Sequence, residues 1–141
     1  MRATLLLMLF LCAGSLSCQT YQSGLQEGIT RVDDTAVVAA LRTISVAQRT
    51  YSVTNGGEFA TLEQLVQGGF LDSRFKSGNP VNDYNFQLVV KGSSSSGTAS
   101  FSCNADPVDS KAGRHFYIDS TSNQIHVNSN KTASASDETI P

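Results

Sequence analysis

Three absences limit what this chain of 141 residues can do. Its 10 lysine and arginine residues are outnumbered by 12 aspartate and glutamate residues and form no basic patch, so nucleic acid is not an expected partner. After Cys18 no apolar run approaches the roughly 20 residues that a membrane-spanning helix needs. The sequence also lacks a nucleophile with a base, a metal triad and a phosphate-binding loop. We therefore expect a domain that is not an enzyme.

Cysteine is scarce, and the positions of the three residues are informative. Cys12 lies in the apolar run 3–13, which follows Arg2 and is too short to span a bilayer, as is typical of a secretory signal peptide. Ala13-Gly14-Ser15 suits ordinary cleavage of such a peptide. Ser15-Leu16-Ser17-Cys18 instead resembles the lipobox of bacterial lipoproteins, with Ser15 where that motif usually has Leu.

The lipoprotein resemblance implies a role for Cys18. Residues 1–17 would be removed as the signal peptide, and Cys18 would become the lipid-modified N-terminus that anchors the chain to a membrane. Gln19 takes the place of the Asp that retains some lipoproteins at the inner membrane, which favours the outer membrane. The alternative is a secreted protein in which Cys18 forms a disulfide with Cys103. If Cys18 is acylated, Cys103 is alone, and on an alternating strand we expect it to be a buried apolar residue.

The mature chain then divides into a tether, a domain and a tail. Residues 18–31 are polar, contain Gly24 and Gly28, and predict a tether. Residues 32–127 form the domain, and residues 128–141, rich in Ser, Thr, Asn and Asp, are predicted to be disordered.

The first half of the domain has a helical period. In the segment 35–55, apolar residues recur at spacings of three and four: Val37, Leu41, Ile44, Ala47 and Tyr51. Asp33 and Asp34 precede this segment as N-cap candidates, and Gly56 follows it as a stop. Thr61 and Gln64 fit a capping box for a short second helix that ends at Gly68-Gly69.

The second half alternates with the period of strands. We predict four strands, at residues 84–91, 98–105, 114–118 and 124–127, joined in part by the serine-rich connector 92–97 and the turn 120–123. A long helix, a short helix and an antiparallel sheet in this order predict an α+β fold with the sheet packed on the long helix.

These elements resemble the head domain of type IV pilin-like proteins and type II secretion pseudopilins. The resemblance covers residues 34–127 and lies in LRTISVAQRTYSVTNGGEFATLEQLVQGGFLDSRF, YNFQLVV and RHFYIDSTSNQI. It implies that Leu41, Ile44, Ala47 and Tyr51 pack on the sheet, that Leu62 and Leu65 belong to the short helix, and that Phe116, Tyr117 and Asp119 belong to a closing strand and turn. The chain departs from the family at its N-terminus, because it has no Gly-Phe-Thr-Leu-x-Glu run and no long apolar helix. Filament assembly by the family's route is therefore not expected.

Two groups of residues are candidates for binding. Asn104, Asp106 and Asp109 place oxygen ligands on what we expect to be one loop, and the pseudopilin resemblance implies a calcium site there. A plain turn at Pro107 is the alternative, and no other cofactor is expected. His115 and His126 lie on strands that are expected to be neighbours, but without a third ligand we interpret them as solvent-facing rather than as zinc ligands.

Two classes of function follow. The first is a non-enzymatic envelope protein whose lipid-anchored, pilin-like head mediates interaction with secretion or pilus subunits. The second is a small secreted or periplasmic domain that binds a ligand or calcium at Asn104, Asp106 and Asp109.

Overall fold

The computed structural model describes residues 17–76, 78–95, 97–109 and 113–140, and divides into two units, Met1–Val32 and Asp33–Pro141. Helix α1 (Ser17–Thr54) contributes the described residues of the first unit and continues into the second. Helix α2 (Leu62–Gln67) and the 3-10 turn η1 (Ser73–Phe75) follow. The remaining elements are the strands β1 (Tyr84–Lys91), β2 (Ser100–Pro107), β3 (His115–Asp119), β4 (Ile125–Asn128) and β5 (Glu138–Ile140). The predicted α+β class is confirmed.

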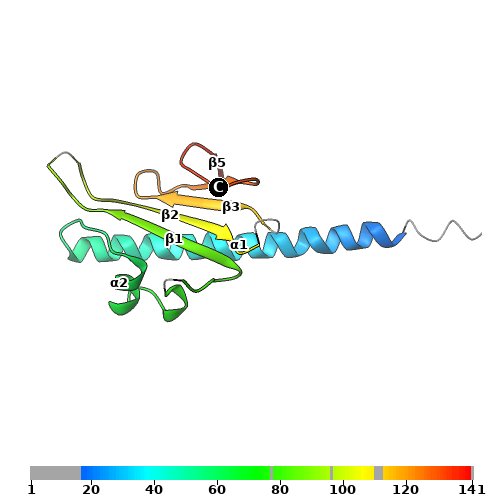
Figure 1. Cartoon of the computed structure of the whole chain (residues 1–141), viewed down its shortest axis with the longest axis horizontal. Coiled ribbons are helices and arrows are strands. Elements are labelled where there is room, and N and C mark those ends of the chain that lie inside the picture. Colours follow the sequence, from blue (N-terminus) through cyan, green and yellow to red (C-terminus); the bar gives the residue numbers. More distant parts are fainter. Residues whose placement is uncertain (1–16, 77, 96, 110–112, 141) are drawn as a thin grey trace, which may run out of the picture. The chain divides into compact units, whose positions relative to one another are not determined.

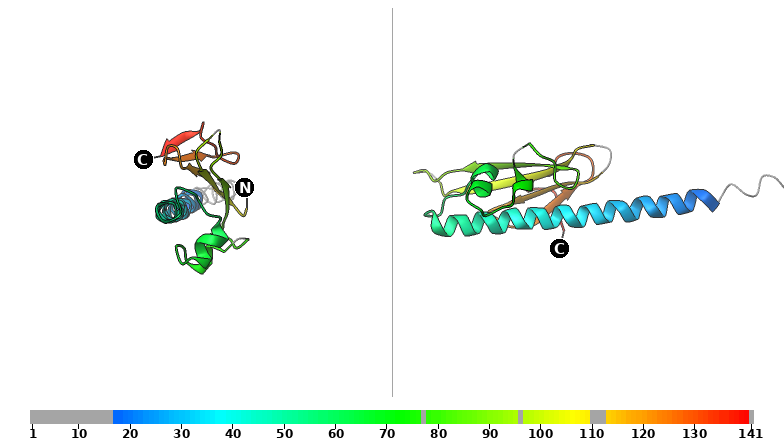
Figure 2. Two further views of the ribbon diagram at one scale, coloured as in Figure 1. Left: turned by 90° about the vertical axis from the view of Figure 1, so that its left-hand side faces the viewer. Right: turned by 90° about the horizontal axis from the view of Figure 1, so that it is seen from below.

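The sheet is an antiparallel meander with the strand order β1-β2-β3-β4-β5. One of its faces packs on α1, and in the end-on view of Figure 2 the sheet and α2 approach that helix from different directions. The helical period identified the contact correctly, because Val37, Leu41 and Ile44 have no exposed surface and Ala47 is buried beside them. Apolar burial of this kind is the main driving force for the assembly of the two layers.

The predicted tether at residues 18–31 is instead helical, because α1 begins at Ser17 and not after Asp34. The segment contains no proline, and each of its two glycines costs only about 1 kcal/mol relative to alanine in a helix. Once a packed helix exists, each added residue gains a hydrogen bond without a new nucleation step. Within the described residues, no helix is both long and apolar enough to cross a membrane. The rest of the predicted signal peptide, residues 1–16, lies outside the described residues.

The short second helix begins and ends as its sequence predicts. Thr61 Oγ1 accepts a hydrogen bond from the Gln64 backbone N–H, while Gln64 Oε1 accepts one from the Thr61 N–H, which completes the capping box. At the other end, Gly69 has a φ of +74°, and the backbone N–H groups of Gly69 and Phe70 donate to Val66 and Leu65. This is the Schellman arrangement, which ends a helix with a left-handed residue.

The strand count and the tail were predicted wrongly. The sheet has five strands and not four, because residues 138–140 pair with β4 as β5 (Figure 1). The segment predicted to be disordered is tied to the sheet by the Asn104 side-chain N–H, which donates to the carbonyl of Ala133 at 2.7 Å. Asp137 Oδ1 also accepts a hydrogen bond from Asn128 Nδ2 at 2.7 Å. Composition alone predicts disorder for a segment this rich in polar residues. In the folded chain, however, polar side chains form hydrogen bonds with the backbone of this segment.

The face of the sheet turned away from α1 is polar, and we call it the outer face. Strict alternation along each strand produces it, since neighbouring residues point to opposite sides. Its members on β2, β3 and β4 are Ser102, Asn104, Asp106, His115, Tyr117, Asp119, His126 and Asn128.

Candidate functional site

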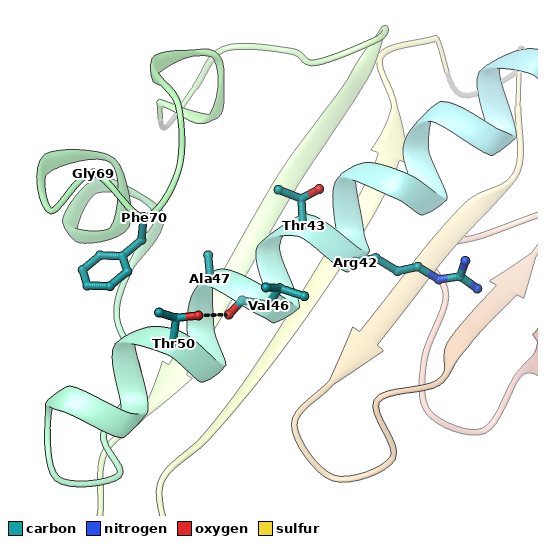
Figure 3. A pocket seen from close by; sticks show the side chains of 7 residues that line it. All are labelled: Arg42, Thr43, Val46, Ala47, Thr50, Gly69 and Phe70. Atoms are coloured by element: carbon teal, nitrogen blue, oxygen red, sulfur yellow. Dashed lines mark hydrogen bonds between the residues drawn. The ribbon is translucent and has the colours of Figure 1, made fainter.

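A groove runs along the side of α1 that the sheet leaves free, and we call it the α1 groove. It has a volume of about 530 Å³, within the range of pockets that bind small molecules or side chains. Figure 3 shows five residues of α1 along one wall and residues that follow α2 opposite them. The lining residues are Arg42, Thr43, Val46, Ala47, Thr50, Gly69 and Phe70.

Phe70 forms the apolar wall of the groove, and the turn that ends α2 places it there. The left-handed turn at Gly69 reverses the chain, so that the ring of Phe70 stacks edge to face on Tyr51 of α1, with 5.5 Å between the ring centroids. Such aromatic pairs contribute about 0.5–1.5 kcal/mol beyond the burial of their area. The groove wall is therefore held in place by the packing of two rings.

The exposed face of α1 combines apolar and basic side chains. Val46 is 63% exposed and Val53 is 85% exposed, and both arginines of this face, Arg42 and Arg49, are exposed as well. The spacings of four, three and four residues place all four on one side of the helix. Valines this exposed contribute little to the core, and together with the two arginines they make this face a candidate contact surface.

The sequence contained a signal for this surface. Val46 and Val53 fall outside the apolar series that begins at Val37, so helical spacing alone places them away from the core. The position of Phe70 in the same groove as Val46 cannot be predicted from any sequence period. It depends on the turn geometry at Gly69 and on a contact between residues 51 and 70.

The structure places the three predicted calcium ligands differently from the sequence analysis. Asn104 and Asp106 lie on the outer face of β2 and not on a loop, and Asp109 follows the strand. The amide nitrogen of Asn104 is bound to the Ala133 carbonyl, and Asp106 Oδ1 lies 2.5 Å from His115 Nδ1. Across the described residues, no three or more His, Cys, Asp or Glu side chains gather as metal ligands. A calcium site here stays a prediction.

The expectation that both histidines face solvent is wrong. His115 is 7% exposed and His126 is 6% exposed, although both lie on the outer face. The segment between β4 and β5, which was predicted to be disordered, contacts His126, as the Nδ1 of His126 lies 2.8 Å from the backbone oxygen of Asp137. The two strands are neighbours as predicted, with His126 opposite Tyr117.

A smaller pocket of about 140 Å³ lies at the outer face and includes Lys91, Tyr117 and Asp119 in its lining. Burial alone would raise the pKa of the Asp119 carboxyl, but backbone N–H groups of Ser122 and Thr121 donate to it, and its pKa lies below the ordinary value. Burial and the neighbouring Asp119 carboxylate raise the pKa of Tyr117. The Tyr117 hydroxyl donates to Asp119 Oδ2 at 3.2 Å, so these polar groups already satisfy one another.

Cys103 is a free and fully buried thiol, as predicted for a residue on the core face. Burial raises its pKa to about 12, so the thiolate that acts as a nucleophile or metal ligand is not formed near neutral pH. The disulfide with Cys18 is therefore not the state that the structure describes. Cys18 itself belongs to the first turn of α1, and lipid attachment there stays a prediction.

Comparisons with protein-family models, with curated proteins and with solved structures found no match to this chain.

Proposed function

We propose that this chain is a non-enzymatic envelope protein, held on a membrane by a lipid on Cys18, whose pilin-like head binds other proteins through the α1 groove. Subunits of a type II secretion system or a type IV pilus are the proposed partners. The observation that carries the proposal is the exposed face of α1, where Val46 lines the α1 groove together with Phe70 and Val53 is exposed further along the helix.

The α+β architecture supports this proposal in a general way. A helix that lies along an antiparallel sheet is the arrangement that the resemblance to pilin-like heads implies. In this chain α1 buries one face against the sheet, while Arg42, Val46, Arg49 and Val53 of the same helix are exposed. Fold alone does not define function, so the argument depends on the chemistry of the free face.

That chemistry suggests what a partner must offer. Interface centres are apolar and aromatic, while arginine is the charged residue most compatible with them. A partner that fills the α1 groove would place an apolar side chain against Val46 and Phe70 and an acidic one near Arg42. The overall charge of the chain is −2, so the presence of both Arg42 and Arg49 on this face is a local feature and not a consequence of composition.

Site-specific crosslinking in a bacterial envelope tests the proposal. A photoreactive residue would replace Val46 in the α1 groove, and a matched variant would carry it at Val89, an exposed valine on β1. We expect adducts with secretion or pilus subunits from position 46 and not from position 89. Equal adducts from both positions, or no such adduct from position 46, would refute the α1 groove as the binding surface.

A further inference from the structure

The C-terminal segment 129–137, which we call the strap, covers the outer face of the sheet (part of the orange-to-red segment in Figure 1). Ala133 is buried at 3% exposure and accepts the hydrogen bond from Asn104 of β2. His115 and His126 are the only histidines of the chain, and both are buried on the face that the strap covers. The strap contacts His126 directly, and histidine is the side chain whose charge changes between about pH 5 and pH 8.

The hydrogen bond of His126 defines its tautomer. A backbone carbonyl can only accept, so the Nδ1 that lies 2.8 Å from the oxygen of Asp137 must carry the hydrogen. In the neutral ring Nε2 is then a bare acceptor. This atom is buried and has no hydrogen-bond partner among the described residues. When the strap lies on the sheet, which we call its closed form, the neutral ring fits beneath it, because Nε2 carries no hydrogen that would need an acceptor.

Protonation changes that situation. The cationic ring carries a second N–H at Nε2, and in the closed strap this donor would be buried without an acceptor. Burying an unpaired polar group costs free energy, and burying an unpaired charge costs more. Opening the strap would let water reach the ring, so a proton binds more readily to the open form.

The described surroundings of His126 offer no acceptor to its Nε2. The ring of Tyr117 on β3 meets it edge to face at 5.9 Å, and the strap presents the backbone of Asp137 to it. The Asp137 carboxylate already accepts hydrogen bonds from Asn128 and Ser134 and interacts with Lys131.

His115 is arranged in the opposite way. Its Nδ1 lies 2.5 Å from Asp106 Oδ1, so a proton on that ring is paired with a carboxylate. Of the two histidines, only His126 is therefore expected to be favoured in its neutral form, over its protonated form, by the closed strap.

We propose that the strap is a pH-responsive cover: protonation of His126 in mild acid releases residues 129–140 from the sheet. Release of β5 exposes the edge of β4, and release of the strap exposes the outer face from Asn104 to Asn128. Of residues 129–140, Ile140 packs against the core between α1 and the sheet as a partly buried side chain, so release removes this contact and leaves the buried members of the core in place. This device is separate from the α1 groove, which lies between α1 and the residues that follow α2 and has no lining residue in the strap.

Hydrogen exchange of the full chain tests the proposal at pH 7.5 and pH 5.5, after correction for the intrinsic exchange rates. In the unmodified protein we expect the protection of residues 129–140 to fall at least about tenfold at the lower pH, while residues 37–51 keep theirs. His126→Gln should abolish the dependence, because an amide can donate to the Asp137 carbonyl and does not titrate. His115→Gln is the matched control and should retain it. Unchanged protection of the strap in the unmodified protein, or the same pH response in His126→Gln, would overturn the proposal.

A second experiment uses the unmodified protein, so that the proposal can be tested even if a variant does not fold. NMR titration of the unmodified chain follows the ring protons of His126 and the amides of Ala133 and Thr139. The proposal requires the three signals to change with one midpoint. A His126 ring that titrates while both amides stay unchanged would overturn it.

Discussion

The guanidinium of Arg114, the residue before β3, donates hydrogen bonds to one carboxylate oxygen of Asp34 on α1. Its Nε and Nη2 donate to Asp34 Oδ2 at 2.9 and 2.7 Å, which joins α1 to the residue before β3 across 80 positions of sequence. Asp34 is 6% exposed, whereas the side chain of Arg114 is 41% exposed. The residue that the sequence offered as a helix cap thus serves to hold the helix against the sheet.

We expect this pair to be coupled energetically. Asp34→Ala and Arg114→Met should each lower the free energy of unfolding by about 1–3 kcal/mol, because each removes one partner of these hydrogen bonds and leaves the other without them. A double-mutant cycle in urea should give a coupling of about 0.5–2 kcal/mol, at the lower end if the exposed side of Arg114 is well solvated. Strict additivity of the two losses would contradict the structural role of the pair.

Gln48 should be among the most sensitive positions on α1. It is fully buried, and its side-chain amide forms two hydrogen bonds with the backbone of Ala60, at 2.9 Å from the Ala60 N–H and 2.5 Å to the Ala60 carbonyl. Gln48→Met keeps the size of the side chain but leaves both backbone groups buried and unpaired, at a cost of about 2–4 kcal/mol. Gln87→Met, at an exposed position on β1, is the control for equilibrium unfolding. Equal losses in the two variants would contradict this account.

Much of the fold was predictable from the sequence because it depends on local patterns. The face of α1 that contacts the sheet, the capping box of α2 and the alternation of the strands all lie within one turn or one strand of the chain. The start of α1 was not predictable, since a polar segment with two glycines becomes helical only as the continuation of a packed helix. The ordered tail was missed for a similar reason, because its hydrogen bonds to Asn104 and Asn128 join distant residues and leave no trace in composition.

The candidate site was less predictable than the fold. Exposed valines on α1 could be identified from the helical period, but the groove also needs Phe70, which a turn at Gly69 and a ring contact with Tyr51 bring into place. The histidines were assigned to solvent because the strap that buries them was expected to be disordered. The position of Phe70 and the burial of the histidines were missed for the same reason. Each depends on packing between segments that are distant in the sequence and share no periodic pattern.

Two adjacent glycines provide a direct test of the α1 groove wall. A Cβ at Gly68 would lie 2.9 Å from the ring carbons of Phe70, so Gly68→Ala should displace that ring from the groove. Gly69 has open space around it but a φ of +74°, so Gly69→Ala should cost about 1 kcal/mol through backbone strain alone. We expect the crosslinking yield at position 46 to fall more in Gly68→Ala than in Gly69→Ala. The reverse order would argue against Phe70 as part of the binding surface.

Asp119 should contribute to acid sensitivity. Its carboxylate is favoured in the folded state, where its pKa lies below the ordinary value, so its contribution to stability is present above about pH 4 and is lost as the pH falls through the folded pKa. In Asp119→Asn the free energy of unfolding should therefore depend less steeply on pH below about pH 4 than in the unmodified protein. Glu63→Gln, on the exposed side of α2, serves as the control in denaturant titrations at each pH. A slope that Asp119→Asn leaves unchanged would contradict the hydrogen-bonded role of this carboxylate.

The anchor at Cys18 is the central claim, because it determines where the head can meet a partner. The intact mass of the protein from the membrane fraction of a bacterial host, compared with a Cys18→Ala variant, tests it most directly. We predict a mass raised by acyl chains on a chain that begins at Cys18, and a variant that moves to the soluble fractions. An unmodified chain that begins near Leu16 and is already soluble would contradict the account.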